Sequence, residues 1–232
     1  MGTTSRFAAI ALGVVLAGAG LWYGGRVTVE NIVRDYLLQN PEILAQASEN
    51  LQRKQATATL AGVRQSVETP FPGAVLGNPN GHVTMVEFSD YACGYCRQSL
   101  PDVAALIARN PDLRIVVREL PIISPHSADA AKLALAAAEQ GKYAAFHDAM
   151  FAAGQITPQT MTAVAAKIGL DMDRAKRVAS DPTVEAELNR NIETAGRLGF
   201  SGTPSWIVGD HMIPGAVGID QLAEALKAVR PA

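Results

Sequence analysis

Cys93 and Cys96 are the only two cysteines of the chain, and Gly94 and Tyr95 separate them. They come directly after the apolar segment 83–88, which has the length and composition of a buried strand. A strand that leads into a helix opening with Cys-x-x-Cys is typical of a dithiol redox site. The pattern therefore predicts thiol–disulfide exchange.

The start of the helix explains why this spacing suits redox chemistry. There the Cys93 sulfur lies near unpaired backbone N–H groups and the positive end of the helix dipole, which favour a thiolate over a thiol. Arg97 adds a nearby positive charge. Cys96 lies on the same side of the helix one turn deeper, so it can attack a mixed disulfide on Cys93 and release the substrate. We expect Cys93 to attack and Cys96 to resolve.

Two other roles for the cysteine pair are a zinc site and a structural disulfide. A zinc ion needs four ligands, and the histidines of the chain are too scattered to complete the set. They are His82, His126, His147 and His211. A disulfide that closes so short a loop removes little entropy from the unfolded chain. Redox chemistry explains the pair better than either role, so we expect neither a metal nor a cofactor.

Glu87 is an acidic residue inside the predicted strand 83–88. Burial of an ionised carboxylate is costly, so the pKa of Glu87 should be raised. A buried acid of this kind can pass protons to and from the Cys96 sulfur. The alternative is a partly solvated strand end, because acidic residues are rarely fully buried.

The rest of the domain is predicted to surround this unit with strands and helices. Residues 113–120 form the next strand, and residues 205–213 form a hairpin. Between them, residues 126–198 are predicted to be an inserted all-helical subdomain, with Ser127 as one of its helix caps. We expect His147 to be a packed or surface residue, because no acid or nucleophile is placed locally to use it.

The composition is that of an ordinary globular protein, with 48% hydrophobic residues and a net charge of -2. A chain of this length can bury a core without disulfide staples. The longest basic run is Arg53-Lys54, so nucleic acid is not an expected partner.

Residues 7–25 carry no charge and follow Arg6. As a helix they would be about 28 Å long, enough to cross a bilayer core. The positive charge before the segment places the remainder of the chain on the non-cytoplasmic side. The small residues 17–19 resemble a cleavage site, so residues 1–26 are expected to be a signal peptide or a retained membrane anchor. The alternative is a buried core helix.

Residues 27–72 are predicted to form a helical stalk and a linker. Apolar residues recur at helical spacing in two helices, which are separated at Pro41. An apolar stripe outside a closed core usually marks an interface, so we expect residues 27–68 to self-associate into a dimer or trimer. The alternative is that the helices pack back on their own domain. Proline and glycine mark 69–73 as the linker, which leaves 73–232 as the catalytic domain.

From about residue 75 to 230 the sequence resembles the DsbA family of bacterial thiol–disulfide oxidoreductases. The matching motifs are Cys93 and Cys96, an acid six residues before the first cysteine (Glu87), Thr203-Pro204 within Gly-Thr-Pro, and Phe-His-Asp at 146–148. The resemblance implies an α/β fold, namely a thioredoxin-like fold with an inserted all-helical subdomain, preceded by an N-terminal helical segment.

The resemblance also implies where the substrate binds. A proline at a strand start is by itself either an ordinary edge residue or a cis bond in a tight turn. In the family it is a cis proline beside the active site, here Pro204, and the backbone at Thr203 pairs with the substrate as an added strand. We expect Gly94 and Tyr95, between the cysteines, to complete the substrate-binding residues.

Segment 33–42 is similar to the stalk of ScsC-like members of the family, which are linked to copper tolerance and in some cases are oligomeric isomerases. Gly94-Tyr95 and the threonine before Pro204 are similar to the disulfide isomerase DsbC, whereas DsbA itself has Pro-His and Val at these places. The resemblance favours an isomerase or reductase over a monomeric disulfide-forming oxidase. Another alternative is a copper-tolerance protein whose two sulfurs hold Cu(I).

Together these predictions describe an enzyme that faces the periplasm, free or anchored to the inner membrane by residues 7–25. The expected substrates are unfolded or misoxidised exported proteins. The enzyme is also expected to have a membrane redox partner. If the enzyme is an isomerase, this partner would reduce its cysteine pair, and if it is an oxidase, the partner would reoxidise the pair. Further copies of the chain are expected to bind through residues 27–68.

Overall fold

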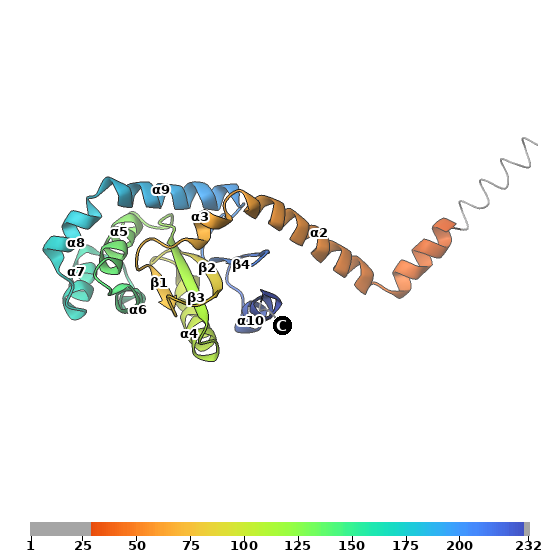
Figure 1. Cartoon of the computed structure of the whole chain (residues 1–232), viewed down its shortest axis with the longest axis horizontal. Helices are drawn as coiled ribbons and strands as arrows, with labels where there is room; N and C mark the ends of the chain where they lie inside the picture. Colours follow the sequence, from red (N-terminus) through yellow and green to blue (C-terminus); the bar gives the residue numbers. More distant parts are fainter. Residues whose placement is uncertain (1–28, 230–232) are drawn as a thin grey trace, which may run out of the picture. The chain divides into compact units, whose positions relative to one another are not determined.

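The computed structural model describes residues 29–229 (Figure 1). The predicted signal peptide or anchor, residues 1–26 with the apolar segment 7–25, lies outside this range. Among the described helices, none combines the length and the apolar character that a membrane span requires. The chain divides into two compact units, Met1–Gln52 and Arg53–Ala232.

A five-stranded mixed sheet forms the centre of the second unit, with the strand order β1-β3-β2-β4-β5. The strands are β1 (Val75–Gly77), β2 (Val83–Ser89), β3 (Leu113–Glu119), β4 (Ser205–Val208) and β5 (His211–Pro214). β2 and β3 are parallel, and the other neighbouring strands are antiparallel. The strand that precedes the cysteines, β2, therefore lies in the middle of the sheet with both of its edges paired.

Helices surround this sheet and fill the segment between β3 and β4. They are α3 (Arg64–Glu68), α4 (Gly94–Arg109), α5 (Ser127–Ala138), α6 (Tyr143–Ala153), α7 (Pro158–Lys167), α8 (Met172–Ala179), α9 (Pro182–Arg197) and α10 (Ile219–Val229). Residues 29–39 and α2 (Glu42–Ala61) precede them. α5 to α9 all lie between β3 and β4, which makes them the helical insertion of the predicted fold class.

The sheet is apolar on both faces because side chains alternate along each strand. α4 and α10 cover one face of the sheet (Figure 1). Met85 and Ile115 point to that face. Val86 and Val116 point to the opposite face, which α3 and α9 cover. This alternation puts Glu87 on the α4 face, the side on which the cysteines lie.

The domain begins earlier in the chain than residue 73, where we predicted its start. Leu60, Val63 and Val67 are at most 5% exposed. They belong to a buried apolar cluster with Phe88 of β2. The second compact unit accordingly starts at Arg53, so the end of α2 and all of α3 belong to the domain and not to the stalk.

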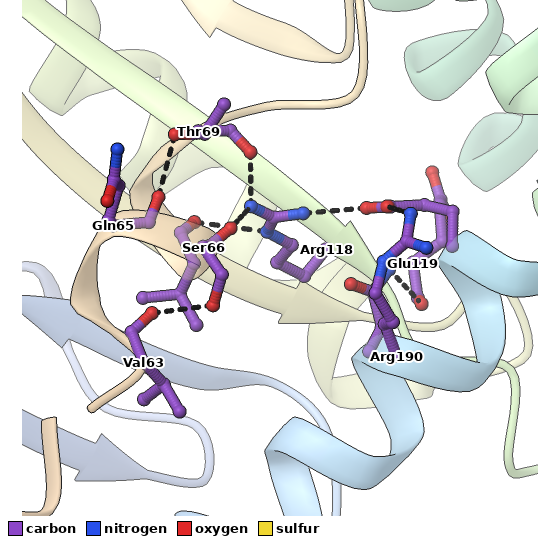
Figure 2. A network of polar contacts seen from close by, with 10 residues as sticks. Val63, Gln65, Ser66, Thr69, Arg118, Glu119 and Arg190 are labelled. Carbon is purple, nitrogen blue, oxygen red and sulfur yellow. Dashed lines mark hydrogen bonds and ion pairs between the residues drawn. The ribbon is translucent and has the colours of Figure 1, made fainter.

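Arg118 of β3 holds this early segment in place (Figure 2). Its guanidinium donates hydrogen bonds to three backbone carbonyl groups and to one carboxylate. The carbonyls belong to Ser66, Val67 and Thr69, and the carboxylate belongs to Glu187 of α9. Arg118 is only 5% exposed, so these partners compensate a charge inside the protein.

The first unit presents large apolar side chains that are mostly exposed. Ile32, Val33 and Tyr36, which belong to the predicted helical stripe, are between 51% and 61% exposed. Leu44 of α2 is 56% exposed, and it lines an apolar pocket of about 490 Å³ together with Val33 and neighbouring residues. The predicted stripe is therefore a surface feature of residues 29–52.

Candidate dithiol active site

Cys93 occupies the N-cap position of α4, after the short loop that follows β2. Its backbone is extended, with φ -79° and ψ 114°, and its sulfur accepts a hydrogen bond of 3.2 Å from the backbone N–H of Cys96. The sulfur thus takes the place of an ordinary N-cap oxygen and faces the unpaired N–H groups of the first turn. The predicted position of the cysteines at a helix start is confirmed.

The two sulfurs are free thiols in different electrostatic states. Cys93 is 4% exposed and Cys96 is 1% exposed. The pKa of Cys93 is lowered to about 6, chiefly because the Cys96 thiol donates a hydrogen bond to its sulfur. The same hydrogen bond, together with burial, raises the pKa of Cys96. At neutral pH the site therefore holds a thiolate at position 93 and a thiol behind it.

Glu87 lies in the middle of the sheet, where it pairs with Val117 of β3 and Trp206 of β4. Its side chain is 1% exposed, so it is a fully buried acid and not a solvated strand end. Burial and, to a smaller extent, the charge of Cys93 raise the pKa of Glu87 to about 8, and a hydrogen bond from Ser89 opposes the rise. A carboxyl group with a pKa near neutrality can both accept and donate a proton under physiological conditions.

Thr203 and Pro204 are joined by a cis peptide bond directly before β4, as the resemblance implied. The carbonyl oxygen of Thr203 lies 3.2 Å from the Cys93 sulfur and accepts a hydrogen bond from it when Cys93 is protonated. Gly94 and Tyr95 lie on the exposed first turn of α4, and Tyr95 is 63% exposed. The structure therefore brings all of the predicted substrate-binding residues to one end of α4.

Asp90 is a residue of this site that the sequence analysis missed. Its buried carboxylate accepts hydrogen bonds from the backbone N–H groups of Ala92, Ile122 and Ile123 and from the hydroxyl of Ser127. These bonds tie the loop before Cys93 to the loop after β3. The signal that could have identified Asp90 is its place just after a strand, where an Asp side chain often binds the backbone two residues on.

His147 lies on α6 and is 1% exposed. Its ring packs against Tyr91 and Phe151. Burial lowers the pKa of His147 to about 4, so the ring is neutral at physiological pH. The prediction of a packed histidine is confirmed.

The arrangement has the groups that thiol–disulfide exchange requires. They are an ionised sulfur at the helix start, a protonated sulfur behind it, a buried acid on the adjoining strand and the backbone carbonyl of Thr203 beside the first sulfur. Within residues 29–229, no three His, Cys, Asp or Glu side chains converge in a way that could hold a metal ion.

Two family models match the chain. The DSBA-like thioredoxin domain matches residues 84–227, which is more than half of the sequence. The Copper resistance protein ScsC N-terminal domain matches residues 26–58, which include the helical region ahead of the sheet.

Solved structures of similar fold include several oxidoreductases. A thioredoxin-like oxidoreductase from Silicibacter pomeroyi is 41% identical, with a TM-score of 0.67 over 73% of this chain and 98% of that one. The thiol-disulfide exchange protein alpha-DsbA2 from Wolbachia pipientis is 26% identical, with a TM-score of 0.70 over 78% and 98%. Proteus mirabilis ScsC in a transitional conformation is 27% identical, with a TM-score of 0.66 over 88% and 96%.

The curated relatives are longer proteins. The Na(+)/H(+) antiporter NhaA 3 of Salinispora tropica is 32% identical over 155 residues, which are 66% of this chain and 24% of that protein. The Na(+)/H(+) antiporter NhaA of Herminiimonas arsenicoxydans is 29% identical over 178 residues, which are 76% and 28%. The chain thus spans about a quarter of the length of the curated relatives it matches.

The DSBA-like match runs from β2 into α10, so it includes the strand and the helix that position the cysteines as well as the helical insertion. The similarity to the two solved proteins from Silicibacter pomeroyi and Wolbachia pipientis covers 73% and 78% of the chain. The predicted fold class, a thioredoxin-like fold with an inserted helical subdomain and preceding helices, is confirmed. The chain belongs to the DSBA-like thioredoxin domain family, and its N-terminal helical region matches the ScsC N-terminal domain.

Proposed function

We propose that this chain catalyses thiol–disulfide exchange in exported proteins through Cys93 and Cys96. The observation that carries the proposal is the position of the Cys93 sulfur at the N-cap of α4, where it accepts the N–H of Cys96 and its pKa is lowered to about 6. A sulfur that is ionised at neutral pH is the nucleophile that disulfide exchange needs.

In the reductive direction, the Cys93 thiolate attacks a substrate disulfide. A bond forms between Cys93 and one substrate sulfur, and the other substrate sulfur leaves as a thiolate. Cys96 then gives its proton to Glu87, attacks the Cys93 sulfur and releases the second substrate thiolate. The substrate gains two electrons and the enzyme becomes a disulfide, which a membrane redox partner must reduce again.

Substrate docking is assigned to Thr203, Pro204 and the first turn of α4. The Thr203 carbonyl lies 3.2 Å from the Cys93 sulfur, so a substrate strand bonded to Cys93 would run beside this backbone. Main-chain pairing tolerates many sequences, which suits an enzyme for unfolded or misoxidised proteins. Gly94 borders open space and Tyr95 is exposed, so both are accessible to the substrate.

The proposed direction is that of an isomerase or reductase, with a monomeric oxidase as the alternative. Gly94-Tyr95 and Thr203 support this direction because they resemble the disulfide isomerase, and residues between and beside the cysteines tune the redox poise. The exposed apolar stripe supports self-association through residues 29–52, the part of the predicted segment 27–68 that does not belong to the domain, since Ile32, Val33 and Leu44 are more than half exposed. Several active sites on one particle would favour isomerisation.

Refolding of scrambled ribonuclease separates the two directions. The reduced full-length protein is expected to restore ribonuclease activity, and Cys93→Ala is expected to abolish this effect. Light scattering on the same sample should give the mass of a dimer or trimer. A monomer that oxidises reduced peptides quickly but does not rescue scrambled ribonuclease would contradict the isomerase proposal and support the oxidase.

The proposed location is the periplasm, with residues 7–25 as an export signal or an inner-membrane anchor. The charge before this segment supports the orientation. A related solved structure, 26% identical with a TM-score of 0.65, is that of a periplasmic thioredoxin-like protein from Salmonella enterica. Fractionation of cells should recover the chain with the periplasm or the inner membrane, and recovery with the cytosol would contradict the proposal.

Copper binding is a second candidate function, because residues 26–58 match the Copper resistance protein ScsC N-terminal domain. The sulfurs of Cys93 and Cys96 are soft ligands that suit Cu(I). Titration of the reduced protein with Cu(I) against a strong chelator tests this function. Copper that stays on the protein supports it, and copper that is lost to a weak competitor contradicts it.

A further inference from the structure

A second acid, Glu119, is buried on the same face of the sheet as Glu87. Glu119 is the last residue of β3 and pairs with Ser89, whereas Glu87 pairs with Val117. Residues in register on parallel strands point to the same face, so the two acids are diagonal neighbours on the α4 face. Each is 1% exposed. The exchange steps described above use only Glu87.

Hydrogen bonds distinguish the two acids. Oε1 of Glu119 accepts hydrogen bonds from the hydroxyl of Tyr143 at 2.8 Å and from the hydroxyl of Tyr91 at 3.1 Å. Oε2 of Glu87 has no hydrogen-bond partner among the described residues. Donors stabilise an ionised carboxylate, whereas burial without donors disfavours it. Two tyrosine hydroxyls thus stabilise a charge on Glu119, whereas the side chain of Ser89 is the donor that lowers the pKa of Glu87.

The two tyrosines link Glu119 to the active-site loop and to the helical insertion. Tyr91 lies two residues before Cys93, and Tyr143 is the first residue of α6. His147 lies one turn further along α6, with Nδ1 3.4 Å from the Tyr91 hydroxyl. A neutral His147 can donate to Tyr91 while Tyr91 donates to Glu119, so the chain of donors ends on the carboxylate. The four side chains of this network are at most 2% exposed.

We propose that Glu119 is a positioning residue for disulfide exchange, whose carboxylate, held by Tyr91 and Tyr143, sets how strongly Glu87 binds its proton. Two carboxyl groups in one buried site resist ionising together. A negative charge on Glu119 therefore makes Glu87 a stronger base toward the Cys96 thiol. The proposal rests on the proposed role of Glu87 as the proton carrier.

The groups around Glu119 support this assignment. They are Tyr91 and Asp90 of the active-site loop, Tyr143 and His147 of α6, and Glu87 of β2. Burial raises the pKa of Glu119 to about 8, the tyrosine hydrogen bonds oppose this rise, and the charges of Asp90 and Glu87 add to it. The pKa of Glu87 is raised to about 8 as well, so both acids titrate in the same pH range, and the charge on Glu119 develops over the range in which Glu87 loses its proton.

Glu119→Gln tests the proposal, because glutamine keeps an oxygen for the tyrosine hydroxyls but removes the charge. The reduced enzyme is mixed with a fluorescent peptide disulfide, and release of the peptide from Cys93 by Cys96 is followed in a stopped-flow instrument from pH 5 to pH 9. The pH midpoint of release is expected to fall by about one unit, as the loss of a nearby like charge in a buried site would produce. Tyr143→Phe, which removes one donor to Glu119, should lower the midpoint by less.

Glu187→Gln is the matched control. It changes a buried carboxylate on the opposite face of the sheet, where Glu187 pairs with Arg118, and should leave the midpoint unchanged. In a Glu87→Gln background, Glu119→Gln should have no further effect on the pH dependence of release.

The outcomes separate this proposal from the proposed function. If Glu119→Gln leaves the midpoint at the wild-type value while Glu87→Gln removes the pH dependence, the role of Glu119 is overturned and the role of Glu87 stands. If Glu87→Gln leaves the pH dependence of release unaffected, Glu87 is not the proton carrier, so the roles of Glu87 and Glu119 both fail while exchange through Cys93 and Cys96 stands. Should Glu119→Gln not fold, an unchanged midpoint in Tyr143→Phe overturns the inference by itself.

Discussion

Glu87→Gln is expected to stabilise the folded protein, and the gain should grow with pH. Glu87 is fully buried, and its pKa rises from 4.5 to about 8, chiefly because burial disfavours the charged form. Between these two values the folded chain keeps a proton that the unfolded chain has released. The contribution of Glu87 to the free energy of unfolding therefore falls as the pH rises through this window.

The gain in the free energy of unfolding follows from the difference between the unfolded and folded pKa values of Glu87. Each pH unit within it changes the free energy of unfolding by about 1.4 kcal/mol. At pH 7 the buried carboxyl should cost about 3 kcal/mol, and above pH 8 the cost should level off at about 5 kcal/mol. The lowered pKa of Cys93 acts in the opposite sense between about 6 and 9.0. Because Cys93 is present in both proteins, its contribution largely cancels in the difference.

Unfolding of the reduced proteins in guanidinium chloride at pH 5, 6, 7 and 8 measures this difference. Glu87→Gln should exceed wild type by under about 1 kcal/mol at pH 5 and by about 3 kcal/mol at pH 7. Glu224→Gln, at an exposed position of α10, is the control and should retain the wild-type pH dependence. A difference between Glu87→Gln and wild type that is the same at pH 5 and at pH 8 would refute the reasoning from burial.

Other substitutions test the packing and the resolving step. Arg118→Met should lower the free energy of unfolding by about 3–5 kcal/mol because it removes one partner of a buried ion pair and leaves Glu187 with only the largely exposed Arg190, and a loss below about 1 kcal/mol would contradict this. Leu60→Ala should cost about 2–5 kcal/mol, and an unchanged unfolding midpoint would show that the end of α2 does not belong to the domain. Cys96→Ala should trap substrates as mixed disulfides on Cys93, visible as reductant-sensitive bands on a non-reducing gel. The absence of such bands would contradict the assignment of Cys96 as the resolving sulfur.

The sequence was sufficient to predict the core of the site, because the relevant signals are local. The Cys93 and Cys96 spacing at a strand-to-helix junction determines which sulfur caps the helix. The apolar run around Glu87 indicates a central strand, and the structure buries that acid in the middle of the sheet. The cis bond at Pro204 needed the family resemblance, since a proline at a strand start is usually trans.

The features that the sequence did not predict depend on contacts between distant segments. The linker signal at 69–73 is local, but Leu60 and Val67 are buried because α3 packs on the far face of the sheet. The prediction of Ser127 as a helix cap is wrong, because His126 holds the cap position of α5 and Ser127 is the first helical residue. The Ser127 hydroxyl instead donates to Asp90 of the active-site loop. The Glu119 network joins β3 to α6 in the same way. The spacing of residue types along the chain does not predict contacts between segments that lie far apart in the sequence.

The central claim is that Cys93 is a thiolate at neutral pH because of its place at the start of α4. The most direct test is the rate of alkylation of the reduced protein by iodoacetamide as a function of pH, with mass spectrometry to locate the label. The account predicts a midpoint near pH 6, with the label on Cys93 and not on Cys96. A midpoint near 9.0, the ordinary value for a cysteine, or equal labelling of both sulfurs would contradict it.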